Sequence, residues 1–137
     1  LYGANLDYID KFTKIPEKIQ ICNFGSSHGL YGYNYEDYSE EYSCFNFGLT
    51  SQTLSYDYRL FQNYENHIDK GTVVFITVSY FSLFGKDEIY GDDFDSKNKR
   101  YYSILPTSLI KEYDIKTDVY VRYLPAFQNG CRAAEPV

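Results

Sequence analysis

One short stretch of the chain carries the residue types that acyl-transfer chemistry needs. Residues 19–29 read Ile-Gln-Ile-Cys-Asn-Phe-Gly-Ser-Ser-His-Gly, so an apolar run leads to a glycine, and two hydroxyls and an imidazole follow. A serine at a strand-to-helix turn exposes its Oγ, and backbone N–H groups there can stabilise the oxyanion of an acyl intermediate. If this protein has chemistry, we expect it at residues 25–29.

The elements that must position this turn follow an alternating pattern. Three apolar, strand-like runs lie at Ile19–Phe24, Tyr42–Phe47 and Thr72–Tyr80, and a helical pattern over about 51–68 separates the last two. Strands joined by helical crossovers form a right-handed parallel sheet. The sequence therefore predicts an α/β fold, a three-layer α/β/α flavodoxin-like parallel sheet, in which ligands and catalytic groups sit at the carboxyl ends of the strands.

The helix over 51–68 is the clearest helical pattern in the chain. Ser51 is a candidate N-cap, and Lys70-Gly71 is expected to close the helix. Apolar residues recur at spacings of three and four and are expected to share one face: Leu54, Tyr58, Phe61 and Tyr64. The following run, Thr72–Tyr80, is continuous in Val, Ile and Phe, as is typical of a strand covered on both faces.

The rest of the chain has weaker organisation. Residues 1–18 predict a short lead-in helix or loop, 85–100 a polar loop, and 101–113 a helix with Thr107 as its cap. Residues 119–124 are strand-like or helical, and 130–137 are predicted to be a disordered tail. A chain of 137 residues suits one domain. We expect residues 1–137 to be a single, partial domain with its best-supported core at 15–85, truncated because a three-stranded sheet leaves an open edge.

Composition and charge exclude several classes of function. The net charge is −6 and no Lys/Arg cluster occurs, which argues against a nucleic-acid partner. Three cysteines without a C-x-x-C pair and two histidines predict neither a metal site nor a disulfide framework. Cys22 and Cys44 lie in apolar runs and are expected to be free thiols. No apolar run approaches the length of a membrane span.

Residues 25–28, Gly-Ser-Ser-His, resemble the first block of the SGNH (GDSL-like) hydrolases, in the Gly-Ser-Ser variant of the DltD-like proteins. Phe45–Gln52 is similar to the second block of that family, and Val73–Phe81 to the third strand of the subgroup. The resemblance implies that Ser27 is the nucleophile and that the Gly48 N–H is an oxyanion donor. It also implies a serine esterase or O-acyltransferase without a cofactor, acting on acyl esters of glycans or cell-envelope polymers.

The chain departs from the family pattern at two points. Ser79 or Tyr80 stands near the place of the third-block asparagine, so Ser79 is a weaker site candidate. The Asp-x-x-His sequence that supplies the general base is not found in these 137 residues. The two histidines are His28, adjacent to Ser27 and therefore a base candidate with difficult geometry, and His67, near the end of the predicted helix. We expect this isolated chain to be an incomplete or inactive form of the enzyme.

Two other functions compete with the esterase. The tyrosines after the first strand, Tyr31, Tyr33, Tyr35 and Tyr38, could stack on sugar rings or on a protein, which would make the chain a non-catalytic α/β binding module. Alternatively, the hydroxyls and N–H groups of residues 25–29 could hold the phosphate of a flavin. The sequence does not fix the acyl group, the acceptor, the oligomeric state or the compartment.

Overall fold

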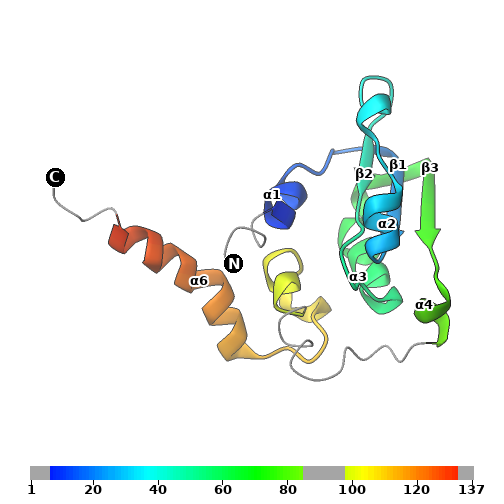
Figure 1. Ribbon diagram of the computed structural model, residues 1–137. Helices are drawn as coiled ribbons and strands as arrows, with labels where there is room; N and C mark the ends of the chain where they lie inside the picture. Colours follow the sequence, from blue (N-terminus) through cyan, green and yellow to red (C-terminus); the bar gives the residue numbers. More distant parts are fainter. Residues whose placement is uncertain (1–6, 85–97, 133–137) are drawn as a thin grey trace. The chain divides into compact units, whose positions relative to one another are not determined.

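The computed structural model describes residues 7–84 and 98–132, which belong to two compact units, residues 1–89 and 90–137 (Figure 1). The expectation of one domain stays a prediction, and each unit is described by itself. The first unit contains, in chain order, α1 (Asp7–Thr13), β1 (Ile19–Gly25), α2 (Ser27–Gly32), η1 (Glu36–Tyr38), β2 (Cys44–Asn46), α3 (Leu54–Tyr64), η2 (Glu65–His67), β3 (Ile68–Thr77) and α4 (Tyr80–Phe84).

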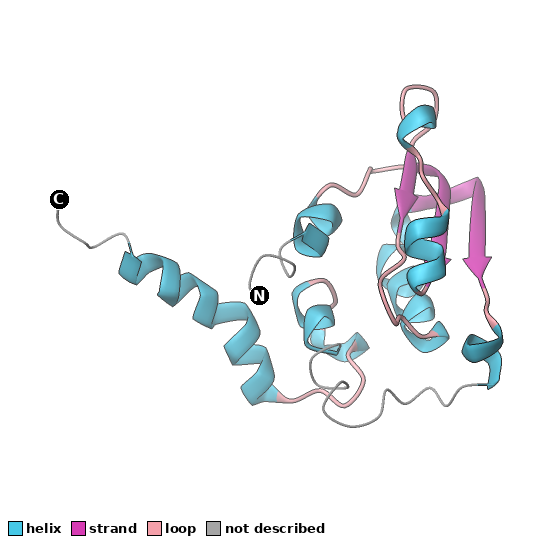
Figure 2. Ribbon diagram, in the orientation of Figure 1, coloured by secondary structure: helices cyan, strands magenta, loops and turns pink. Residues whose placement is uncertain are grey.

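The first unit is built on a parallel sheet with the strand order β2-β1-β3 (Figure 2). Cys22 of β1 is in register with Phe45 of β2 and with Val74 of β3. The α/β fold with a flavodoxin-like parallel sheet is therefore confirmed. Because all three strands run in the same direction, their carboxyl ends meet at one edge of the sheet, where α2, α3 and α4 begin.

Helices cover both faces of β1, as adjacent side chains of this strand show. The Asn23 side chain donates to the Gly29 carbonyl of α2, while the next ring, Phe24, meets Phe61 of α3 edge-on. Neighbouring residues of a strand point to opposite faces, so α2 and α3 lie on opposite sides of the sheet. Phe12 of α1 joins the side of α3, where it contacts Phe45.

An aromatic cluster fills the core on the α3 side. Phe47 is fully buried and stacks on Phe24 with 4.6 Å between ring centroids. It also contacts the rings of Phe12, Phe45 and Tyr64. The aromatic residues, in which the chain is rich, thus form much of the core of this unit.

The structure corrects the predicted N-cap and the predicted buried face of α3. Its N-cap is Thr53, whose hydroxyl accepts from the Tyr56 N–H, while Ser51 adopts a positive φ of 54°. Its buried residues are Tyr56, Asp57 and Leu60. Tyr58 and Phe61 of the predicted apolar face are exposed, because the i, i+4 pair Tyr56/Leu60 lies on the side toward the sheet instead.

The start of β3 also differs from the prediction. Lys70 and Gly71 do not close the helix but lie inside β3, where the register against β1 shifts between Ile19 and Ile21. Gly71 has a φ of +101°, which suits a bulge of this kind.

Strand β3 is not covered on both faces. Apolar side chains on both of its faces are exposed: Val73 (50%), Phe75 (41%) and Ile76 (61%). Among the described residues β3 pairs with β1 alone, and its outer edge has no strand beside it. The prediction of a strand from the continuous apolar run is confirmed, and the prediction that both of its faces are covered is wrong.

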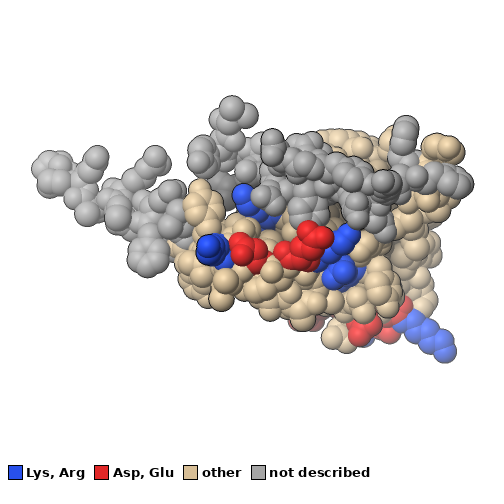
Figure 3. Space-filling model, turned by 90° about the horizontal axis from the view of Figure 1, so that it is seen from below, with Lys and Arg blue, Asp and Glu red and all other residues tan. Residues whose placement is uncertain are grey.

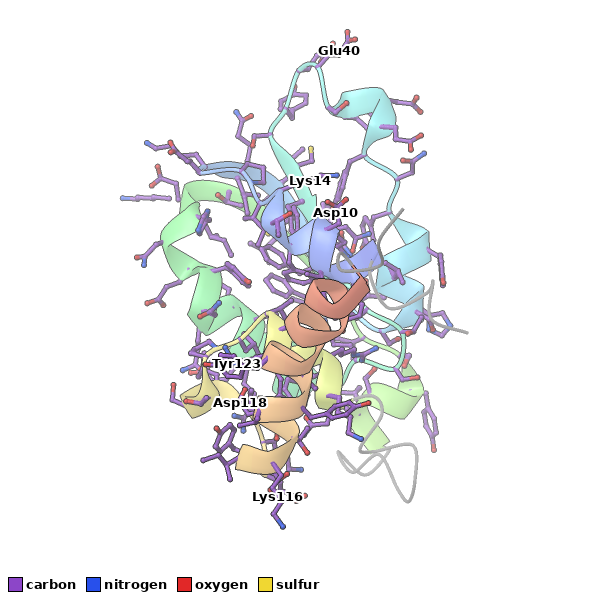
Figure 4. The ribbon with its side chains drawn as sticks, turned by 90° about the vertical axis from the view of Figure 1, so that its left-hand side faces the viewer. Asp10, Lys14, Glu40, Lys116, Asp118 and Tyr123 are labelled. Carbon is purple, nitrogen blue, oxygen red and sulfur yellow. The ribbon has the colours of Figure 1, made fainter. Side chains whose placement is uncertain are left out.

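The second unit is described at η3 (Arg100–Ser103), η4 (Thr107–Leu109) and α6 (Ile115–Arg132). Its buried apolar residues are Tyr101, Tyr102, Ile104, Leu105 and Ile110. On α6, Asp118, which Figure 4 labels, pairs with Arg122 one turn later, and Arg122 donates to the Leu105 carbonyl. Thr107 begins η4, whose N-cap is Pro106.

The run at 119–124 is helical, as one of the two alternatives had it. The helix continues to Arg132, although a disordered tail was expected from residue 130. Residues 133–137 and the predicted loop at 85–97 lie outside the described residues.

The surface of the described residues carries mixed charge. Figure 3 shows acidic and basic side chains side by side rather than in a patch of one sign. Asp10 and Lys14, one turn apart on α1, form an exposed ion pair at 2.5 Å (Figure 4). Within the described ranges no helix is long and apolar enough to cross a membrane.

Candidate functional site

The serine turn, residues 25–28, lies at the carboxyl end of the central strand β1. Ser26 is the N-cap residue of α2, but its side chain makes no cap hydrogen bond. Its carbonyl accepts from the Leu30 N–H at 2.9 Å. Ser27 is the first residue of α2 and is half-buried. The hydroxyls of both serines thus lie at the sheet edge where parallel α/β proteins carry their chemistry.

The imidazole of His28 contacts Ser26 rather than the predicted nucleophile. His28 is exposed, and its Nδ1 lies 3.5 Å from the Ser26 Oγ. No hydrogen bond joins His28 to Ser27 in the described structure. The i, i+2 spacing on this turn places the imidazole near the Ser26 hydroxyl. The contact is long, as catalytic hydrogen bonds often are in structures without substrate.

Gly48, the predicted oxyanion donor, lies directly against α2. A Cβ built on Gly48 would be 2.7 Å from the Leu30 nitrogen, so only glycine fits there. Its N–H donates to the Asn46 Oδ1 at 2.8 Å, and its carbonyl accepts from the Lys11 Nζ at 2.9 Å. The structure therefore brings Gly48 beside α2. An oxyanion there would compete with the Asn46 Oδ1 for the Gly48 N–H.

Lys11, which donates to the Gly48 carbonyl, lies beside two aromatic rings. Its ammonium lies 5.4 Å from the ring centroid of Phe12 and 5.9 Å from that of Phe45. Burial lowers the pKa of Lys11 to about 8, because desolvation disfavours the charged form. The link from Lys11 ties α1 to the segment that follows β2.

The hydroxyl of Ser79, the weaker candidate, is used in hydrogen bonds at the start of α4. Its Oγ lies 2.9 Å from the Ser82 Oγ and also accepts from the Ser82 N–H. Thr77, two residues earlier, is the β3 residue in register with Gly25. The Thr77 Oγ1 is buried and has no hydrogen-bond partner.

A buried amide network, which the sequence analysis did not predict, connects β1 and β2 with α2. Asn23 is fully buried and accepts from the Tyr35 hydroxyl at 3.0 Å. The Nδ2 of Asn23 donates to the Asn46 Oδ1 at 3.0 Å. The Nδ2 of Asn46 lies within hydrogen-bond distance of the Gly29, Leu30 and Tyr33 carbonyls. Asparagines inside two apolar strands were the signal for this network, since a buried amide needs partners.

A buried carboxyl group, Asp57, lies behind the turn and was also missed. It is 7% exposed, and its Oδ1 accepts from the Gln52 Nε2 at 2.6 Å. Burial raises the pKa of Asp57 to about 6, while the hydrogen bond from Gln52 and the backbone of Gly25 act in the opposite direction.

The remaining sequence candidates have structural roles. The Nδ1 of His67, in η2, is 2.7 Å from the Pro16 carbonyl. Cys22 and Cys44 are free thiols. Cys44 is in register with Ile21, the neighbour of Cys22 on β1, so the two thiols lie on opposite faces of the sheet. Among the described residues no group of His, Cys, Asp or Glu could hold a metal ion.

The tyrosines after β1 divide into two kinds. Tyr31 (77% exposed) and Tyr38 are exposed. Tyr33 and Tyr35 stack on each other with 6.3 Å between ring centroids, and Tyr33 also contacts Phe75 of β3. Tyr35 is thus committed to the amide network, while Tyr31 and Tyr38 are available to a partner.

A hollow of about 420 Å³ lies at the opposite end of β2 from the serine turn. It is lined by Pro16 and residues 39–44, including Glu40 at the loop tip in Figure 4. None of the predicted site residues lines it.

Chemically, the serine turn offers two hydroxyls, one imidazole and closely packed backbone at the carboxyl edge of the sheet. Comparison with protein-family models, with curated proteins and with solved structures finds no match for this chain.

Proposed function

We propose that this chain is an SGNH-like serine ester hydrolase or O-acyltransferase for acyl esters of glycans or cell-envelope polymers. Ser27 is the nucleophile of the proposal: its Oγ attacks the ester carbonyl carbon, and the alcohol leaves with a proton returned by the base. The acyl group then passes to water or to a hydroxyl acceptor.

The observation that carries the proposal is the meeting of two segments at one sheet edge. The serine turn follows the central strand β1, and Gly48, which follows β2, packs on α2 so closely that no Cβ would fit. Backbone N–H groups at such a helix start can stabilise a developing oxyanion. This juxtaposition is what an acyl-transfer site needs before any base is considered.

The base is the open part of the proposal. His28 is the described residue with a suitable group, and its contact is with the Ser26 Oγ. A serine hydroxyl without a base is a poor nucleophile. The proposal therefore has to be tested at Ser26 and Ser27 separately.

The test is the intact mass of the protein after exposure to a fluorophosphonate, which reacts with activated serines. We expect a single adduct on the wild-type protein, its loss in Ser27→Ala and its retention in the matched control Ser26→Ala. Loss in Ser26→Ala alone would move the nucleophile to the serine that His28 contacts. Equal labelling of wild type and both variants, or no labelling at all, would overturn the proposal.

The exposed tyrosines favour a second candidate, a binding module for a glycan. Tyr31 and Tyr38 offer rings that the fold does not use, and sugars stack on such rings. Titration with glycan fragments, followed by NMR, should shift signals near Tyr31 in the wild type and not in Tyr31→Ala. No shift in the wild type would count against it.

The flavin alternative has less support from the geometry. A phosphate cradle needs an environment without negative charge, yet the buried carboxyl of Asp57 lies close enough to the turn for the Gly25 backbone to lower its pKa. With a pKa of about 6, this carboxyl is mostly ionised at neutral pH and would repel a phosphate.

A further inference from the structure

The N–H of Gly48, the proposed oxyanion donor, is held by a side chain rather than by the sheet. The N–H groups on either side of it, at residues 47 and 49, donate to carbonyls of β1 at 2.8 and 3.2 Å. Because neighbouring N–H groups of an extended segment point to opposite sides, the Gly48 N–H is turned away from β1. The Asn46 Oδ1 accepts it at 2.8 Å, as asparagine side chains do for the backbone two residues on.

The same side chain also holds the end of α2. The Asn46 Nδ2 lies 3.2 Å from the Gly29 carbonyl and 3.0 Å from the Leu30 carbonyl. The last four carbonyls of a helix have no partner within it, and α2 ends at Gly32, so both of these carbonyls need partners outside the helix. Asn46 therefore holds the segment of the oxyanion donor with its oxygen, and the helix that begins at Ser27 with its nitrogen.

The orientation of the Asn46 amide is fixed by its partners. Asn23, which is fully buried, donates from its Nδ2 to the Asn46 Oδ1 at 3.0 Å and accepts from the Tyr35 hydroxyl at 3.0 Å. If the Asn46 amide were turned over, its Nδ2 would face two donors, the Gly48 N–H and the Asn23 Nδ2, and its Oδ1 would face carbonyls. Only one orientation satisfies all of these groups.

We propose that Asn46 is a positioning residue of the acyl-transfer site, whose single amide sets the place of the Gly48 N–H relative to the helix that begins at Ser27. The inference rests on the proposed function for its catalytic meaning. In the free protein the neutral Asn46 Oδ1 keeps the Gly48 N–H in place. A developing oxyanion carries charge, is therefore the stronger acceptor, and takes this N–H over. A donor held in advance needs no reorganisation at the moment of reaction.

The first measurement is the hydrogen exchange of side-chain amides in the wild-type protein, followed by NMR. Asn66, which is exposed in η2, is the internal control. The Asn46 Nδ2 protons should exchange about 10-fold or more slowly than those of Asn66, because they are bonded to the end of α2. Exchange of both amides at the same rate would overturn the proposal, and this test needs no variant that has to fold.

The second measurement is the rate of fluorophosphonate labelling of Asn46→Asp against reagent concentration. This change keeps the shape of the side chain, but it places an acceptor against the Gly29 and Leu30 carbonyls and a charge on the Gly48 N–H. A misplacement of about 1 Å can cost on the order of 100-fold in rate, so the limiting rate should fall roughly 10- to 100-fold. The concentration that gives half of the limiting rate should change little.

The matched control is Asn66→Asp, the same chemical change at an exposed position, which should label at the wild-type rate. A purely structural role of Asn46 would lower the stability of Asn46→Asp and leave the limiting rate of the folded protein unchanged. That result would overturn the positioning role.

The two measurements separate the two proposals. A labelled wild-type protein whose Asn46 amide exchanges as fast as Asn66 would overturn the positioning role and leave the esterase standing. An unlabelled wild-type protein whose Asn46 amide is protected would overturn the esterase, and with it the catalytic meaning of Asn46, while supporting its hold on Gly48 and α2.

Discussion

The strands on the two sides of β1 hold their apolar residues in opposite ways. β2 spans only Cys44–Asn46, yet Phe45 and the following Phe47 are buried in the aromatic cluster. β3 spans ten residues, but Val73, Phe75 and Ile76 keep between 41% and 61% of their surface exposed. Strand length and apolar content therefore do not decide burial here. What decides it is whether helices reach over the strand, as α1 and α3 do on the β2 side.

The same contrast appears in the polar residues. Asn46 of β2 has all its amide atoms in hydrogen bonds, whereas the hydroxyl of Thr77 at the end of β3 is buried without a partner. The residues on the β2 side form a closed core. The β3 side has exposed apolar surface and a buried hydroxyl without a hydrogen-bond partner.

The largest expected effect is on the aromatic cluster. Phe47→Ala should lower the free energy of unfolding by about 3–5 kcal/mol, because it removes a fully buried ring that contacts four others. Phe75→Ala on β3 should cost only about 1–2 kcal/mol. Urea unfolding of both variants measures the difference. Equal losses would mean that the β3 face is covered in solution.

The next effect is a pH dependence on the β2 side. Because the pKa of Asp57 rises from 3.8 to about 6 on folding, the protein loses stability as the pH rises from about 4 through 6. This loss approaches roughly 3 kcal/mol at pH 7. Asp57→Asn lacks the titration, so the stability of the wild type relative to Asp57→Asn should fall by that amount between pH 4 and pH 7. Unfolding measured at both pH values checks it, and parallel pH profiles would contradict it.

Substitutions of the two polar residues should have opposite signs. Asn46→Ala should cost about 2 kcal/mol, since it removes the amide that bonds to the Gly48 N–H and to the Leu30 carbonyl of α2. Thr77→Val should raise stability by about 1 kcal/mol, because it removes a buried hydroxyl without a partner at nearly constant volume. Thermal unfolding of the pair tests this. A destabilised Thr77→Val would show that the hydroxyl has a partner in solution.

The smallest effect on stability is expected at the exposed face of β3. Ile76→Lys should change the free energy of unfolding by less than about 0.5 kcal/mol, as is usual for an exposed position. It should nonetheless reduce self-association at high concentration, because charge on an edge strand blocks strand pairing. Sedimentation of both proteins measures this, with Lys14→Gln on α1 as a control that leaves the edge unchanged.

Much of the fold could be predicted because its signals are local. Apolar runs separated by a helical pattern sufficed for the parallel sheet, since handedness and chain connectivity leave few alternatives. The buried face of α3 could not be predicted, because Tyr56/Leu60 and Leu54/Tyr58/Phe61 both have helical spacing. Only packing against the sheet decides between them. The exposure of β3 likewise depends on its place at the edge of the sheet.

The position of the serine turn at the end of β1 could be predicted from the sequence, and its contacts could not. A glycine and two serines after an apolar run predicted the turn, because the whole signal lies in residues that are adjacent in the sequence. The contact of His28 with Ser26, the bond from Asn46 to Gly48 and the carboxyl of Asp57 join residues whose relative positions only the fold determines. Asn23 and Asn46 gave a usable signal, since amides in apolar strands must find partners.

The hydroxyl of Tyr35 gives the molecule an optical reporter. It donates to the buried Asn23, and burial, together with the neighbouring thiols Cys22 and Cys44, raises its pKa above the usual range of tyrosine. The chain has no tryptophan, so the ultraviolet absorption of tyrosinate is not masked. In an alkaline titration the tyrosinate absorbance of Tyr35 should appear late, when its hydroxyl leaves Asn23, and so record the loss of this contact without any added label.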